Sequence, residues 1–267
     1  MPRIDAASAL LSSYDTDFIV AHVGQHAVVL RPYELHADDV VITTGAVGLM
    51  PGGLHVPEDL YPVWASQRAG ALLTITTDAR SLSLFERVSL ELGAVRCDVA
   101  AVGLAAATLD ASEAARHEFD WKARAAVLAH DACAGDRDGV EAAVSSLVGR
   151  GAGSTPTGDD VLVGVCAALR MSGRPDASVQ VAACAVDLAH RTTRSSRLFL
   201  RAAEGGRFSE RVHRLAGALT DVRQTAEVMD VLQSWGATSG QDLALGMLGG
   251  LSAIAHDALA VRAGRSA

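Results

Sequence analysis

Short apolar runs rich in β-branched residues dominate the first 110 or so residues of the chain. Runs of this kind predict strands at 17–30, with a break near Gly24, at 39–44 and at 71–76. Residues 45–57 contain four glycines and two prolines, a composition that disfavours regular structure. We interpret Gly45 to His55 as a surface loop, with a lid or a wall of a pocket as the alternative. The beginning of the chain therefore reads as strands joined by turns.

Helical spacing of apolar residues appears first at 82–92, while 94–108 fits either a pair of buried strands or a helix. From about Glu113 onward, alanine-rich segments with helical spacing replace the strand-like runs. Helices are predicted at 121–133, 137–148, 158–172, 177–190, 194–204, 208–219, 221–234 and 239–262.

This change of pattern predicts the α+β class, with a β-rich N-terminal part packed on an all-helical C-terminal part. We place the two domains at 1–112 and 113–267. The boundary has no linker rich in proline, glycine or serine, so we expect the two parts to form one body.

Composition narrows the possible functions. The chain has 267 residues and a formal net charge of −8, which argues against a general nucleic-acid binder. It has no apolar stretch long enough to span a membrane, its first residues lead us to expect no secretory leader, and its four cysteines are widely spaced. We therefore expect a reduced cytoplasmic protein. Lys122 is its only lysine, so an anion site here must use arginine, helix ends or backbone amides.

The most informative segment is GRGAGSTPTGDDVLVG at 149–164, which stands at the start of a strongly apolar helix. Gly151 and Gly153 present backbone N–H groups without a side chain in the way. Thr157 and Asp160 have the spacing of a capping box, with Thr157 as the N-cap. A loop of this kind at a helix start favours anion binding, because free N–H groups and the helix dipole act at the same place.

A second segment, SGQDLALG at 239–246, repeats the pattern of hydroxyl, glycine, any residue, aspartate found from Thr157 to Asp160. Gly164 and Gly246 occupy the same place in the two helices, where glycine costs about 1 kcal/mol relative to alanine. We expect the helices to cross closely there, which would bring the aspartates of their first turns together. Capping combined with packing is the alternative explanation of this pattern.

Two kinds of occupant fit the predicted site. Asp159, Asp160 and Asp242 suit a divalent cation such as Mg²⁺, or they hydrogen-bond amide or hydroxyl donors of a substrate whose anionic group rests on the loop. Arg194 and Arg197 lie on one face of a predicted helix, where either could bind a carboxylate or phosphate. A solvated arginine face is the favoured explanation of such a stripe.

The first segment resembles the signature G-x-G-P-G-L-T-P-S-G-D-D of a bacterial family long catalogued as a domain of unknown function. Its members include the smallest component of the oxamate carbamoyltransferase of allantoin catabolism. GATSGQDLALGMLGGL and TTRSSRLFLRAAEGGRFSE resemble further segments of that family, so that the likeness covers about 140–255. The chain departs from the signature at Ala152, Ser154 and Thr157, and none of these changes removes a charged group.

The resemblance implies a subunit of a carbamoyltransferase of the oxamate/oxalurate type, with a small anionic substrate such as carbamoyl phosphate or a carboxylate, and with partner subunits. A non-catalytic binding or assembly subunit and a Mg²⁺-dependent hydrolase remain as alternatives, so whether the chain alone is an enzyme stays open. The expected catalytic residues are Asp160, Asp242 and Arg194. The expected ligand-binding residues are Gly151, Gly153, Ser154, Thr155, Thr157, Gly158, Asp159, Arg197, Ser239 and Gly240.

Overall fold

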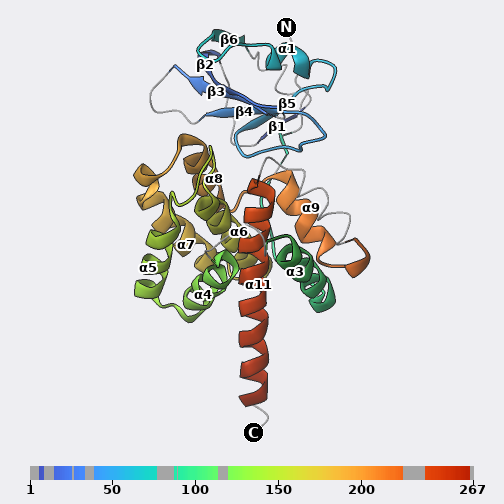
Figure 1. Cartoon of the computed structure of the whole chain (residues 1–267), viewed down its shortest axis with the longest axis vertical. Coiled ribbons are helices and arrows are strands. Elements are labelled where there is room, and N and C mark those ends of the chain that lie inside the picture. Colours follow the sequence, from blue (N-terminus) through green and yellow to red (C-terminus); the bar gives the residue numbers. More distant parts are fainter. Residues whose placement is uncertain are drawn as a thin grey trace. The chain divides into compact units, whose positions relative to one another are not determined.

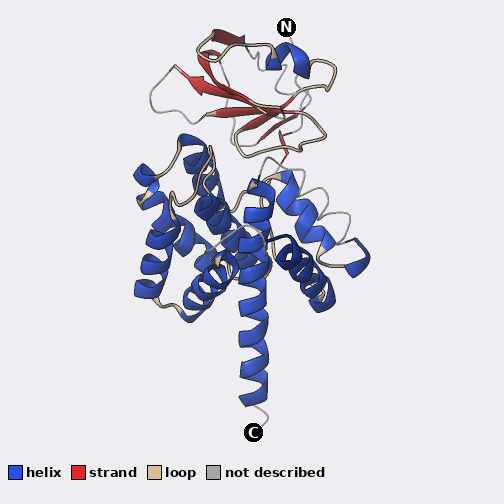
Figure 2. Cartoon of the chain, in the orientation of Figure 1, coloured by secondary structure: helices blue, strands red, loops and turns tan. Residues whose placement is uncertain are grey.

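The computed structural model describes residues 6–8, 15–25, 27–33, 39–76, 87–88, 90–113, 120–224 and 238–264. The chain divides into two compact units. The sheet unit comprises 1–90 with 207–211, and the helical unit comprises 91–206 with 212–267. The described strands lie in the first unit and almost all of the helices in the second, which confirms the predicted α+β class (Figure 2).

One sheet organises the first unit. Its strands are β1 (Ala6–Ser8), β2 (Asp15–Val23), β3 (Val28–Pro32), β4 (Val40–Thr43), β5 (Gly53–His55), β6 (Leu72–Thr76) and β7 (Arg87–Val88). They lie in the order β6-β2-β3-β4-β5-β1-β7. The pairs β4–β5 and β1–β7 are parallel and the other pairs are antiparallel.

The core of this unit follows from alternation along the central strands. Phe18 and Val20 of β2 point to the same face because successive side chains of a strand point to opposite faces. Alternate residues of β3 and β4 continue that face, and the short helix α1 (Tyr61–Ala65) adds the buried Trp64. The strands predicted at 17–30, 39–44 and 71–76 are thereby confirmed, including the break near Gly24.

The glycine-rich segment 45–57 differs from the prediction, because it is buried from Val47 to Leu54 and contains β5. A surface loop is therefore the wrong interpretation. Two of its buried backbone groups form hydrogen bonds with residues far along the sequence. Glu210 accepts the N–H of Leu49, and the Arg211 guanidinium donates to the Val47 carbonyl. Residues distant in sequence supply these partners, so the local composition gives no sign of them.

The predicted helix at 82–92 is wrong at Arg87–Val88, which forms β7. Residues 82–86 lie outside the described part of the chain. The ambiguous stretch 94–108 becomes helical from Val99 onward.

The second unit is built of helices that follow the predicted segments closely. They are α3 (Val99–Glu113), α4 (Trp121–Ala134), α5 (Arg137–Leu147), α6 (Thr157–Met171), α7 (Pro175–Asp187), the 3₁₀ turn η1 (Ala189–Arg191), α8 (Arg194–Glu204), α9 (Glu210–Ala218) and α11 (Ser239–Gly264). The first two residues of α9 belong to the sheet unit. Of the helix predicted at 221–234, residues 222–224 are helical and 225–234 lie outside the described residues. None of the described helices is both long and apolar enough to span a membrane.

Helix α6 is the centre of the helical unit. It is buried from Thr157 to Leu169 and packs against α4, α5, α7, α8 and α11 (Figure 1). A Cβ on Gly164 would lie 2.7 Å from the backbone nitrogen of Met247, and one on Gly246 would lie 2.8 Å from the Cα of Val161. The predicted close crossing of α6 and α11 is thus confirmed.

Candidate functional site

The segment from Gly149 to Pro156, here called the signature loop, enters α6 without regular structure. Gly149, Gly151 and Gly153 have φ of 71°, 115° and 97°, whereas no other residue type has positive φ in the described chain. This alternation along the backbone is typical of loops that turn successive N–H groups to one side. The N–H groups of residues 151–155 donate to no acceptor within the described residues, so they are available to an external anion.

The start of α8 is fastened to this loop. Thr193 is the N-cap of α8, accepting the N–H of Ser196 at 3.1 Å and donating to the Ser154 carbonyl at 2.6 Å. Thr192 donates to Oδ2 of Asp159, whose Oδ1 accepts the N–H of Gly149 at 2.8 Å. Sequence reasoning gave Thr192 no role, although it lies in a segment that resembles the family.

The start of α11 is joined to the same loop from another direction. The hydroxyls of Thr155 and Ser239 lie 2.7 Å apart, and Thr157 donates to Oδ2 of Asp242 at 3.0 Å. The structure therefore joins the two matched helix starts through their hydroxyl and carboxyl groups. The capping box predicted for Thr157 is wrong, because Pro156 is the N-cap of α6 and leaves the Thr157 side chain to reach α11.

Asp160 contributes a buried carboxyl to this cluster. Its side chain is buried, with 7% of the residue exposed, and Oδ2 has no hydrogen-bond partner. Burial raises the pKa of Asp160 well above its ordinary value, and the carboxylates of Asp242 and Asp159 raise it further. Hydrogen bonding from Ser239 and Thr155 acts in the opposite direction. The two aspartates of the matched helix starts thus lie close enough to influence each other, as the sequence predicts.

Replacement of Asp160 by asparagine is expected to stabilise the protein at neutral pH. A carboxyl whose folded pKa is raised loses folding free energy as the pH rises from the unfolded pKa of about 4 towards the folded pKa. The amide of Asp160→Asn does not ionise, so its advantage should grow over that interval and reach roughly 1–3 kcal/mol. Urea unfolding at a series of pH values measures this difference. A difference that does not vary with pH would contradict the raised pKa.

The other predicted ligand-binding residues lie at the starts of α8, α11 and α6. Arg197 lies in the first turn of α8, where Nη2 donates to the Thr192 carbonyl and Nε is buried without a partner. Arg194 is the first residue of the same helix, and Gly240 is the buried second residue of α11. The N–H of Gly158 donates to the Arg150 carbonyl at 2.8 Å, so this amide is not available to a ligand, contrary to the prediction.

A metal site is not evident from the geometry. Within the described residues, no group of three or more histidine, cysteine, aspartate or glutamate side chains is placed to hold a metal ion. Asp159 is held by Gly149 and Thr192, so both of its oxygens already have protein donors. Binding of Mg²⁺ by Asp159, Asp160 and Asp242 stays a prediction.

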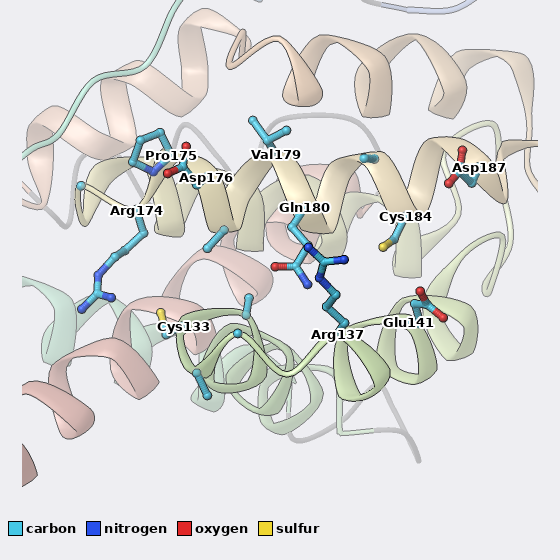
Figure 3. A pocket seen from close by; sticks show the side chains of 16 residues that line it. Cys133, Arg137, Glu141, Arg174, Pro175, Asp176, Val179, Gln180, Cys184 and Asp187 are labelled. Carbon is cyan, nitrogen blue, oxygen red and sulfur yellow. The ribbon is translucent and has the colours of Figure 1, made fainter.

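A groove of about 750 Å³ lies elsewhere in the helical unit, between the α4–α5 turn and α7. Figure 3 shows Arg137 extending from the start of α5 toward Gln180 on α7. None of the residues lining this groove is one of the predicted site residues. Within the described part of the chain, no side chain that lines the groove has a buried polar atom without a hydrogen-bond partner. The signature loop is therefore a better candidate for the ligand site than the groove, because Oδ2 of Asp160 has no partner and the loop N–H groups donate to no acceptor among the described residues.

Comparison with known protein families gives a match that falls on this cluster. Residues 147–251 match the family described as "Oxamate carbamoyltransferase subunit AllH". No curated protein and no solved structure matches the chain significantly. The matched region contains the signature loop, the start of α8 and the start of α11, so the family likeness and the hydrogen-bonded cluster coincide. Over residues 147–251, the chain is therefore similar to the family of the oxamate carbamoyltransferase subunit AllH.

Proposed function

We propose that this chain is a subunit of an oxamate-type carbamoyltransferase and that it binds an anionic substrate at the signature loop. The observation that carries the proposal is the set of backbone N–H groups at 151–155, which have no acceptor among the described residues. They lie beside the starts of α6, α8 and α11, as the Ser154–Thr193 and Thr155–Ser239 contacts indicate. Helix N-termini and free amides both favour an anion.

The reaction implied by the family forms a bond between the amide nitrogen of oxamate and a carbamoyl carbon. The bond from that carbon to the phosphate oxygen breaks, phosphate leaves, and the nitrogen loses one proton, which gives oxalurate. We assign phosphate or carboxylate binding to the loop amides and to Arg194 or Arg197. Asp160 and Asp242 would line the reacting end of the substrate. Catalysis by such a site consists of positioning and charge stabilisation.

Partner subunits are part of this proposal, because the matched family is described as a subunit. An assembly role without catalysis differs from the proposed function in one respect. It requires that loss of the aspartates at the helix starts leave the activity of the assembled enzyme unchanged.

Phosphate-dependent cleavage of oxalurate and carbamoyl transfer to oxamate, each measured with and without candidate partner subunits, test the proposal. Asp160→Ala and Asp242→Ala are expected to lower the transfer rate by about 100-fold or more, since each removes a buried group at the reacting end. Asp176→Ala is the matched control, because Asp176 also lies in the first turn of a helix but is exposed. Wild-type rates in both site variants would contradict the assignment.

A further inference from the structure

The Asp160 oxygen that lacks a donor identifies a property of the ligand. Asp160 is buried, and its Oδ2 has no hydrogen-bond partner among the described residues. A buried acceptor without a donor is rare in native proteins and costs free energy. An N–H group of a bound ligand would supply the missing donor.

The neighbouring charges restrict what can stand next to Asp160. Asp242 from α11 and Asp159 from the same helix both act on it as negative charges. Asp242 is 1% exposed and receives the Thr157 hydroxyl, while Asp159 receives Gly149 and Thr192. A second anionic group of the ligand at this place would meet like charges on three buried aspartates. A neutral group that donates hydrogen bonds would not.

We propose that Asp160 is the specificity-determining residue of the site, accepting an amide N–H of the ligand and rejecting a carboxylate in the same position. The ligand is then a monoanion that bears a neutral primary amide next to its anionic group. The anionic group lies on the N–H groups of 151–155 and the amide faces Asp160. This inference rests on the proposed function, because it assumes that the substrate lies at the signature loop.

Binding of oxamate and of oxalate to the full chain, alone and with candidate partner subunits, tests the inference by calorimetry. The two molecules have nearly the same shape, and oxalate has a carboxylate where oxamate has an amide. The wild-type protein is expected to bind oxamate at least about tenfold more tightly than oxalate. In Asp160→Asn the side-chain amide donates to a carboxylate, so the preference should fall to about one or reverse in favour of oxalate.

Asp176→Asn serves as the matched control and should keep the wild-type preference, since Asp176 is exposed at the start of α7. Thermal unfolding of each variant verifies that it is folded, and Asp160→Asn is expected to be at least as stable as the wild type. An unchanged preference in Asp160→Asn, with oxamate still bound, overturns the inference and leaves the proposed function intact. Failure of the wild-type protein to bind oxamate or to transfer a carbamoyl group, alone and with the partner subunits, overturns both.

Discussion

Substitution of alanine for Gly164 or Gly246 is expected to lower the free energy of unfolding by about 3 kcal/mol or more. A Cβ on Gly164 would overlap the carbonyl oxygen of Leu243, and a Cβ on Gly246 would overlap that of Val161. The obstacles are backbone atoms of the facing helix, so no side-chain rotation relieves them. Helix α6 is buried along nearly its whole length and cannot move away from α11 without disturbing four other helices.

Gly103 supplies the matched control for this prediction. It lies in the interior of α3 and is exposed, and a Cβ added there meets no atom within 4 Å. Gly103→Ala should stabilise the protein by about 0.5–1 kcal/mol, because alanine loses less conformational freedom on folding. Urea unfolding of the three variants measures the contrast. Equal stability of Gly164→Ala and Gly103→Ala would show that α6 and α11 do not pack as closely as the structure has them.

The crossing of α6 and α11 was predictable because its cause is local. Glycine in the second turn of an alanine-rich helix is unfavourable, and its repetition at Gly164 and Gly246 indicates a contact that excludes any side chain. Strands β2, β3, β4 and β6 were predictable for a similar reason, since their β-branched residues mark them directly. The short strand β5 has no β-branched residues that would predict it from the sequence. Its place in the sheet depends on pairing with β1 and β4.

The candidate site was predictable as a set of residues but only partly as a set of contacts. The repeated pattern of hydroxyl, glycine and aspartate brought Asp160 and Asp242 together correctly. It assigned Thr157 to the wrong partner, since Pro156 is the N-cap of α6 and the Thr157 hydroxyl donates to Asp242 of α11. Thr192 escaped detection because its role depends on the fold, which places the end of η1 against Asp159.

Asp159 illustrates how the structure changes the role of a predicted residue. From the sequence it is a candidate ligand for substrate or metal, yet it is 2% exposed and both of its oxygens accept hydrogen bonds from the protein. One donor is the N–H of Gly149 at the start of the signature loop, and the other is the hydroxyl of Thr192 just before α8. The geometry therefore favours a positioning role, in which Asp159 holds the loop against α8.

Asp159→Ala is expected to lower the free energy of unfolding by about 3 kcal/mol, because it removes two hydrogen bonds to a charged group and leaves the N–H of Gly149 without an acceptor. Asp159→Asn retains an acceptor for Gly149 and should cost only about 1 kcal/mol. Thr192→Val removes one of the two bonds and should fall between them. Chemical denaturation with Asp176→Ala as the exposed control measures the series, and that control should change stability by less than about 1 kcal/mol.

Activity separates positioning by Asp159 from direct contact with the substrate. If Asp159 only holds the loop, Asp159→Asn should keep most of the wild-type kcat for carbamoyl transfer, and any loss should appear mainly in KM, because a displaced loop binds the anion less well. A direct role would make Asp159→Asn as inactive as Asp160→Ala while it remains folded. That result would return Asp159 to the substrate, and the Gly149 and Thr192 hydrogen bonds would then serve to orient a catalytic carboxylate.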